Sequence, residues 1–343
     1  MHTTKAARYY SKSDIRIEEV DLPELKPGEA KVRVRACGIC GSDLTDWYMK
    51  PRAPAFFGHE PAGDVVEVGK GVANLKEGDR VFVHHHVPCF VCHYCLRGYY
   101  TLCQTFKDTS LFPGGFSEYI IVPALNVERD TLRLPESVSY QEATLIEPVG
   151  CCIKGTKRAN IQLGDTVAVI GAGFMGLVHV QLARLFGAGR VITIDSVPYR
   201  LGKAEEFGSD HTINFKENPV LDRFRELNEG RGADVVIVCT GHHDALEEGI
   251  EIAEKGSTVY LYAPLPPDTS FPIDIYRFFF SEITLITTYS ASHLDTRAAL
   301  SLIESGQIDA KNLVTHRYPL EKTGEALKLA MRAKDSLKVV VTI

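Results

Sequence analysis

Short alternating runs of apolar and polar residues mark the first part of the chain, up to about residue 87. Such runs occupy residues 15–17, 30–34 and 65–68, and turn residues such as Pro27-Gly28 and Gly69 separate them. Alternation with a period of two indicates strands that bury one face, and short strands divided by turns are typical of an antiparallel barrel or sandwich. We therefore predict a β-rich domain here.

The pattern changes after about residue 155, where continuous apolar runs alternate with helical periodicity. Residues 166–170 read Thr-Val-Ala-Val-Ile, and a helical pattern follows over residues 177–186. Alternation of this kind is what a doubly wound parallel sheet requires. Later strands are expected at residues 190–194, 234–238, 257–262, 283–288 and 338–343, and later helices at residues 245–253, 296–305 and 322–332.

The pattern thus divides an α/β protein into three parts. We expect a β-rich domain at residues 1–154, a doubly wound parallel sheet domain at residues 155–289 and a C-terminal segment at residues 290–343. A length of 343 residues is enough for two hydrophobic cores.

Two short segments of the first domain carry metal-binding side chains beside glycines. They read Gly38-Ile39-Cys40-Gly41-Ser42-Asp43 and Gly58-His59-Glu60. Thiolate, imidazole and carboxylate groups all suit zinc, and the glycines allow the tight turns that point short side chains at one ion. Either Cys40 or His59 alone would be interpreted as an ordinary core residue, but together they predict a zinc site.

Four further cysteines lie within fifteen residues, at Cys89, Cys92, Cys95 and Cys103. This spacing can close a tetrahedron of thiolates around one zinc ion, which is typical of a structural site and far less so of free buried thiols. His84-His85-His86 comes just before. Because consecutive residues of a strand face opposite ways, we interpret these histidines as strand residues leading into the cysteine segment.

The segment Gly171-Ala172-Gly173-Phe174-Met175-Gly176 joins the first apolar strand of the second domain to its helix. In that context the glycines let a pyrophosphate approach the N-terminus of a helix. Asp195 ends the next strand, and a carboxylate there favours NAD over NADP, whereas Arg200 nearby leaves NADP open. The expected cofactor-binding residues are Gly171, Gly173, Phe174, Met175, Gly176, Asp195 and Arg200.

Composition narrows the function classes. A net charge of −6 provides no basic field for nucleic acid or an anionic membrane. No stretch approaches the roughly 18 to 20 apolar residues that span a bilayer, and no signal peptide is visible. Nine cysteines, four of them clustered, indicate metal rather than disulfides. We expect a cytoplasmic protein.

The run from Gly58 to Val72 follows the pattern GHE-x2-G-x5-G-x2-V. With the cysteine cluster and the glycine motif in the same order, the whole chain resembles the zinc-containing medium-chain alcohol dehydrogenase family, in its sorbitol or polyol and threonine dehydrogenase branch. The resemblance implies a GroES-like first domain, a Rossmann second domain and a tail that returns to the first. It also implies a homodimer or homotetramer, with the strand at residues 283–288 as a candidate interface.

The resemblance adds Glu147, in the segment Leu145-Ile146-Glu147-Pro148. In similar polyol dehydrogenases a glutamate here lies at the catalytic zinc, as a ligand or as a partner of the metal's water. Ethanol-type relatives have a Cys-His-Cys set instead. Glu60 and Glu147 therefore both stay open as the third protein ligand beside Cys40 and His59.

The expected reaction is the reversible oxidation of a secondary alcohol, such as a polyol or sugar derivative, with NAD as hydride acceptor. Ser42 could begin the proton path or bond its own turn, and Thr45 stands where many relatives have a relay histidine. Asp43 is interpreted as a turn-capping or supporting carboxylate.

The substrate stays open at this stage. Trp47 could line the pocket or belong to the core, and the loop charges Lys50 and Arg52 would suit a phosphorylated or acidic substrate unless they are simply solvated. The alternatives are a threonine 3-dehydrogenase-like enzyme, a polyol-phosphate dehydrogenase and, least favoured, a non-catalytic NAD-binding relative.

Overall fold

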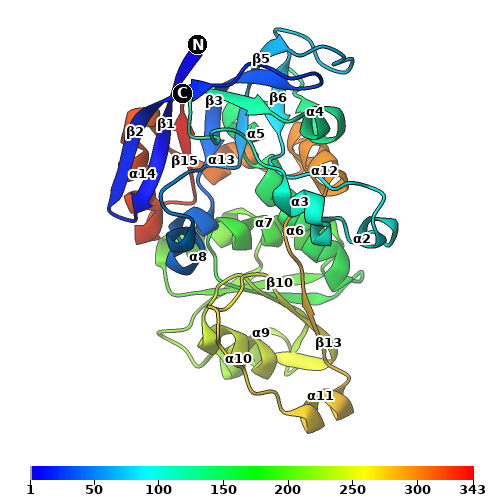
Figure 1. Cartoon of the computed structure of the whole chain (residues 1–343). Helices are drawn as coiled ribbons and strands as arrows, with labels where there is room; N and C mark the ends of the chain where they lie inside the picture. The colour runs from blue at the N-terminus through cyan, green and yellow to red at the C-terminus, as the bar shows by residue number, and fades with distance from the viewer. Residues whose placement is uncertain (1) are drawn as a thin grey trace. The chain divides into compact units, whose positions relative to one another are not determined.

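The computed structural model describes residues 2–343, and the chain forms two compact units (Figure 1). The first unit holds residues 1–150 together with residues 290–343, and the second holds residues 151–289. Helix α6 (Ile146–Ala159) carries the chain from the first unit into the second, and the expected boundary after residue 154 lies within this helix.

The first unit is built on two β-sheets. A seven-stranded sheet has the order β15-β16-β3-β5-β6-β8, with β7 also paired to β3, and a smaller sheet has the order β2-β1-β4. The strands are β1 (His2–Ser11), β2 (Asp14–Leu22), β3 (Ala30–Gly38), β4 (Ala55–Phe56), β5 (Pro61–Val68), β6 (Arg80–Val83), β7 (Tyr119–Val122), β8 (Thr131–Arg133), β15 (Val314–Pro319) and β16 (Lys338–Thr342).

Strand β3 explains why this unit needs the C-terminal segment. Its alternate residues Val32 and Val34 are fully buried in the core of the unit. At its end, β3 pairs with β16, so the last strand of the chain completes the sheet. Helix α14 (Thr323–Arg332) packs on strand β2 in the same unit, at the red and blue ends of the colour scale (Figure 1).

Short helices fill the connections of the first unit. They are α1 (Asp46–Met49), α2 (His93–Leu96), α3 (Gln104–Asp108), α4 (Ala124–Asp130), α5 (Tyr140–Ala143), α12 (His293–Glu304) and α13 (Ala310–Leu313), with 3-10 turns at η1 (Gly41–Leu44), η2 (Lys50–Arg52), η3 (Tyr100–Leu102) and η4 (Leu320–Lys322). Helices α4 and α12 contact each other.

The second unit is a parallel six-stranded sheet in the order β11-β10-β9-β12-β13-β14. Its strands are β9 (Thr166–Ile170), β10 (Arg190–Asp195), β11 (His211–Asn214), β12 (Ala233–Val238), β13 (Ala253–Leu261) and β14 (Thr284–Thr287), and its helices are α7 (Phe174–Leu185), α8 (Pro198–Glu206), α9 (Val220–Leu227), α10 (His243–Glu251) and α11 (Ile275–Ser281). Every residue of β9 is buried because neighbouring strands and covering helices enclose it.

The predicted fold class is confirmed: a β-rich unit accompanies a doubly wound parallel sheet. The helix predicted at residues 245–253 was wrong at its end, because α10 stops at Glu251 and Ala253 already pairs with β12. Among residues 2–343 no helix has both the length and the apolar character needed to cross a membrane.

Candidate active site and metal centres

The four clustered cysteines lie in one lobe of the first unit. The Sγ atoms of Cys92 and Cys95 are 3.6 Å apart, and those of Cys89 and Cys95 are 4.0 Å apart. Zn–S bonds of about 2.3 Å in a tetrahedron place sulfur atoms about 3.8 Å apart, so the thiols have the separation that zinc imposes. All nine cysteines are free thiols, which leaves this set available to a metal.

Backbone N–H groups lower the pKa of Cys89 and Cys103, whereas burial raises the pKa of Cys95 to about 12. Burial tends to raise the pKa of Cys103, but backbone N–H groups of Cys89 and Phe106 outweigh it and lower that pKa to about 6. The N–H of Cys89 donates to the Cys103 sulfur at 3.4 Å. Because a metal binds the deprotonated thiol, these contacts prepare the lobe for a closed structural zinc site.

A second, mixed set is formed by Cys40, His59 and Glu60. One ligand atom from each lies within 4.8 Å of the others, although the two segments are separated by a loop and strand β4. Zinc bonds of about 2.0–2.3 Å require ligand atoms about 3.3–3.8 Å apart, so the set can close on one ion through small side-chain movements. The expected pairing of the two glycine-bounded segments is therefore present in the fold.

Asp43 supports both ligand segments. It is buried, its Oδ2 accepts the backbone N–H of Cys40 at 3.0 Å, and its Oδ1 lies 3.6 Å from Nδ1 of His59. Burial lowers the pKa of His59 most strongly, but the negative groups Asp43, Cys40 and Glu147 together raise it well above its usual value. The surroundings of His59 therefore favour a positive charge, as a cation site needs.

Glu60 is paired with a lysine from the other end of the chain. Lys338, on β16, forms an ion pair with Oε2 of Glu60, and both side chains are almost fully buried. Burial acts to raise the pKa of Glu60 and to lower the pKa of Lys338. The attraction between the two charges has the opposite effect: it acts to lower the pKa of Glu60 and to raise that of Lys338. A Cβ at Gly38 would overlap this carboxylate and crowd the Lys338 side chain, so a larger residue there would have to displace the pair.

Glu147 lies in the first turn of α6 and is buried. One of its carboxylate oxygens lies within 4.8 Å of a ring nitrogen of His84 and of His85. The interpretation of His84 to His86 as strand residues was wrong, because β6 ends at Val83. Free of the strand's alternation, the rings of His85 and His59 approach to 4.9 Å between centroids.

The remaining candidates in this unit, Thr45, Ser42 and Trp47, have different surroundings. The Thr45 hydroxyl donates to the Gly41 carbonyl at 2.9 Å, which commits it to the turn. Ser42 is partly buried in that turn, within η1. Trp47 is 40% exposed, so it is no core residue, and it packs edge-on against Tyr48.

The two loop charges also differ. Arg52 lies over the Tyr48 ring at 3.8 Å and donates to the Tyr48 carbonyl, so its guanidinium is engaged locally. Lys50 is exposed to solvent. The pair therefore does not form a preorganised anion site.

The second unit carries the glycine motif between β9 and α7. Gly171 has a φ of +96°, which favours glycine, and a Cβ at Gly176 would overlap the Gly171 carbonyl oxygen. At Gly173 an added Cβ would meet nothing nearer than Arg200, at 3.8 Å. Gly173 is also the N-cap of α7 and has no side chain to cap the helix, so the space at this helix N-terminus suits a pyrophosphate.

Asp195 and Arg200 border this loop. Oδ2 of Asp195 accepts the N–H of Ala172 at 2.7 Å, and Oδ1 accepts the N–H groups of Ser196 and Val197 at 2.6 and 2.9 Å. Burial lowers the pKa of Arg200, and its Nε is buried with no hydrogen-bond partner. Asp195 thus fixes the glycine loop to β10. The guanidinium of Arg200 lies at the edge of this loop, and its Nε has no hydrogen-bond partner.

Sequence reasoning missed Lys338 and the convergence of His84 and His85 on Glu147. The one signal for Lys338 was a lysine that directly precedes the apolar residues of the last strand. Neither the ion pair nor the approach of the histidines to Glu147 can be inferred from spacing, because both depend on contacts between distant parts of the chain.

Two protein-family models match this chain. The family model "Alcohol dehydrogenase GroES-like domain" matches residues 26–136, and the model "Zinc-binding dehydrogenase" matches residues 175–305. The chain is 34% identical to a sorbitol dehydrogenase of Bacillus subtilis, over 98% of this chain and 96% of the relative. It is 35% identical to an L-threonine 3-dehydrogenase of Pyrococcus furiosus, over 94% and 93%.

A solved structure is similar to this chain over its whole length. The chain superimposes with a TM-score of 0.89, at 28% identity and over 100% of both chains, on a zinc-binding dehydrogenase from Sinorhizobium meliloti that is bound to NADP. The chain thus belongs to the zinc-containing medium-chain alcohol dehydrogenase family.

Proposed function

We propose that the chain is an NAD-dependent zinc dehydrogenase that interconverts a secondary alcohol of a polyol or sugar derivative with the matching ketone. The observation that carries this proposal is the convergence of Cys40, His59 and Glu60 on one point in a chain that also holds an open glycine cradle. The similarity to a sorbitol dehydrogenase supports the polyol class. When bound, zinc supplies Lewis acidity and NAD the hydride acceptor that alcohol oxidation needs.

For the zinc ligands we assign Cys40, His59 and Glu60. Glu60 lies within ligand distance of the other two, and its pairing with Lys338 involves one oxygen, Oε2, so the carboxylate can still offer Oε1. Oδ1 of Asp43 lies 3.6 Å from Nδ1 of His59 and would orient the ring so that Nε2 faces the metal. Glu147 faces His84 and His85, which makes it the second choice for this zinc.

For the proton route we keep Ser42, which lies two residues after Cys40 in the same turn. Thr45 is bonded to the Gly41 carbonyl and is the poorer candidate. For cofactor choice we propose NAD, since the Asp195 carboxylate beside the cradle would repel a 2′-phosphate. Arg200 would then neutralise the pyrophosphate.

The main alternative is an amino-alcohol substrate, because a threonine 3-dehydrogenase is equally similar to this chain. A phosphorylated polyol is less favoured, since Arg52 is engaged with Tyr48. The exposed indole of Trp47 is our candidate substrate contact in the loop after Cys40.

The decisive experiment measures NADH formation against a panel of C4 to C6 polyols, simple secondary alcohols, threonine, sugar acids and polyol phosphates. The proposal is supported if the unchanged protein oxidises polyols and if Glu60→Gln loses both this activity and about one bound zinc ion per chain. Turnover of threonine alone would overturn the substrate class. Loss of that zinc in Glu147→Gln, with Glu60→Gln unaffected, would overturn the ligand assignment.

We also propose that the enzyme is a homodimer joined through the second unit. Strand β14 is the edge of the parallel sheet, and Leu285 on it is exposed. The preceding helix α11 exposes four large apolar side chains, Ile275, Tyr276, Phe279 and Phe280. An unpaired edge strand beside an apolar patch is a surface that a second copy can cover symmetrically.

Sedimentation of the purified protein tests the dimer. The double variant Phe279→Glu with Phe280→Glu should sediment as a monomer at concentrations where the unchanged protein is a dimer. An unchanged sedimentation coefficient in the variant would exclude this surface. We place the enzyme in a reducing compartment such as the cytoplasm, because the cysteine lobe needs free thiols to hold zinc.

A further inference from the structure

The proposed reaction gives no role to Asp130, the last residue of α4. Its side chain is fully buried, and a buried carboxylate costs free energy unless several donors satisfy it. The groups bonded to Asp130 therefore show which parts of the chain it holds together. They lead by two routes to the cysteine lobe, residues 89–103.

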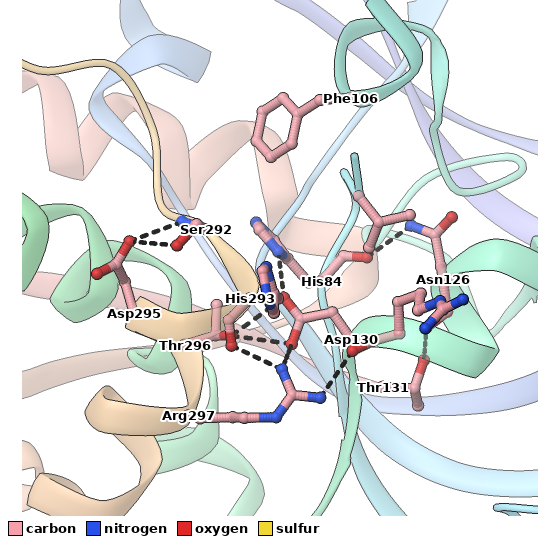
Figure 2. Close-up of polar contacts among 12 residues, drawn as sticks. His84, Phe106, Asn126, Asp130, Thr131, Ser292, His293, Asp295, Thr296 and Arg297 are labelled. Atoms are coloured by element: carbon pink, nitrogen blue, oxygen red, sulfur yellow. Dashed lines mark hydrogen bonds and ion pairs between the residues drawn. The ribbon is translucent and has the colours of Figure 1, made fainter. Parts of the chain in front are cut away.

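Asp130 joins two segments that are far apart in the sequence. Its Oδ2 lies 2.7 Å from Nδ1 of His84, a fully buried residue directly after β6 (Figure 2). The hydroxyl of Thr296, in α12, donates to both carboxylate oxygens at 2.9 and 3.0 Å, and Arg297 donates to Oδ1 at 3.4 Å (Figure 2). One carboxylate thus ties the end of β6 to the beginning of α12.

Helix α12 reaches the lobe through His293, its first residue. The His293 ring packs edge-on against Phe90 and Tyr100, with 4.8 Å between centroids in both pairs. The guanidinium of Arg129, the neighbour of Asp130 in α4, lies 5.1 Å from the centroid of the Phe90 ring. Phe90 is therefore held by α12 and α4, the two helices that Asp130 joins.

The segment after β6 reaches the lobe through the ring of His84. This ring meets that of Phe106 edge-on, at 6.0 Å between centroids. Phe106, in α3, is fully buried and forms a small core with Cys95 and Cys103. Both segments that Asp130 joins thus pack against rings that lie beside the metal-binding thiols.

Phe90 connects these ring contacts to the thiols through its backbone. It lies directly after Cys89 and has a φ of +65°, in the left-handed region that bulky residues rarely adopt. A backbone hydrogen bond joins it to the sulfur of Cys95. An unfavourable conformation of this kind persists only where the surroundings enforce it, and the contacts with His293 and Arg129 provide that restraint.

We propose that Asp130 is a positioning residue for the cysteine lobe. By fixing His84 and α12, it keeps Phe90 in the conformation that orients the thiol of Cys95 for zinc. Groups that orient metal ligands in this way are needed for tight binding. Because coupling between two sites is reciprocal, zinc in the lobe also stabilises α12. This role is separate from the substrate and from the reaction at Cys40 and His59.

The rate of zinc release from the lobe tests this role. The measurement is made in the Cys40→Ser background, which removes a ligand of the mixed centre, and native mass spectrometry confirms that about one zinc ion per chain remains. Transfer of this ion to the coloured chelator 4-(2-pyridylazo)resorcinol then gives the release rate. Urea unfolding of the same samples gives their overall stability.

Two variants interrupt the proposed contacts. Asp130→Asn keeps the size of the side chain but removes its charge, and His293→Ala removes the ring that packs on Phe90 and Tyr100. Each should speed zinc release by roughly 10- to 100-fold. The matched control is Leu294→Ala, since Leu294 is the next residue of α12 and is 52% exposed. It should release zinc at the unchanged rate.

Hydrogen exchange provides a test that needs neither variant, should one of them fail to fold. Removing the remaining zinc from the Cys40→Ser protein should speed amide exchange in α12 at least several-fold, and leave exchange in α14 of the same unit unchanged. Equal exchange in α12 with and without zinc would overturn the proposal. So would release rates in Asp130→Asn and His293→Ala that equal the control, or that rise only in proportion to a loss of stability in urea.

Discussion

The two units build their candidate sites in opposite ways. The parallel-sheet unit uses backbone: the residues between β9 and α8 supply the glycine turn, the helix N-terminus and Asp195 within one short stretch of chain. The β-rich unit uses side chains: Cys40, His59, Glu147 and Lys338 come from four separate segments of the chain. A site built from backbone is sensitive to the size of the residues in it, whereas a site built from side chains is sensitive to the type of ligand group that they carry.

The largest effect should follow from a change of chemistry in the β-rich unit. Cys40→Ser replaces a thiolate by a weak ligand, and alcohol-dependent NADH formation should fall by about 10³-fold or more. The fold should persist, because the lobe and both cores are untouched. Steady-state rates and zinc content measure this, and Cys151→Ser, outside both cysteine sets, is the matched control. Near-normal turnover in Cys40→Ser would mean that the mixed centre is not catalytic.

A change of shape in the parallel-sheet unit comes next. Gly176→Ala forces a methyl group against the Gly171 carbonyl oxygen and should cost about 2–3 kcal/mol of unfolding free energy and most of the NAD affinity. Gly202→Ala in α8 is the control, since nothing lies within 4 Å of its Cβ. It should be neutral or stabilise by up to about 1 kcal/mol. Equal unfolding midpoints in urea for the two variants would contradict this account.

A smaller effect should follow when only the charge beside the cradle is removed. Asp195→Asn should raise the KM for NAD by about tenfold, near 1.4 kcal/mol, and improve the use of NADP. Initial rates with both cofactors measure the change, with the exposed Asp222→Asn as control. If the preference for NAD were unchanged, Asp195 would serve only to hold Ala172 and the loop.

The smallest expected effect concerns pH. Burial lowers the pKa of His179, in α7, to about 3. The unfolded chain therefore binds this proton below pH of about 6.5 while the folded chain does not, so stability is present above that pH and is lost as the pH falls. Between pH 7.5 and 5.5 the loss from His179 should be about 1.3 kcal/mol.

His179→Gln tests the assignment, since glutamine can still bond Thr156, the partner of His179 Nδ1 at 3.2 Å. Urea unfolding at the two pH values should give a smaller difference for the variant than for the unchanged protein. The same difference in both would show that other groups control the acid sensitivity.

The same contrast explains what the sequence could predict. The strand at residues 166–170 and the cysteine cluster were found in full, because their signals lie in consecutive or closely spaced residues. Cys40 and His59 were found through a motif. Lys338, Asp130 and the turn of His84 toward Glu147 were not, because each depends on a tertiary contact between distant elements that no local pattern encodes.

The place of Lys338 in the last strand also has a consequence for synthesis. Translation delivers residues 151–289 as a continuous stretch, so the parallel-sheet unit can fold while the ribosome is still working. Strand β3 emerges early but waits for β16 until residues 338–342 have also been made. Until then Glu60 has no ammonium beside it. A chain that lacks β16 would therefore hold a folded nucleotide cradle in one unit and an unfinished metal centre in the other, and activity would require residues 338–342.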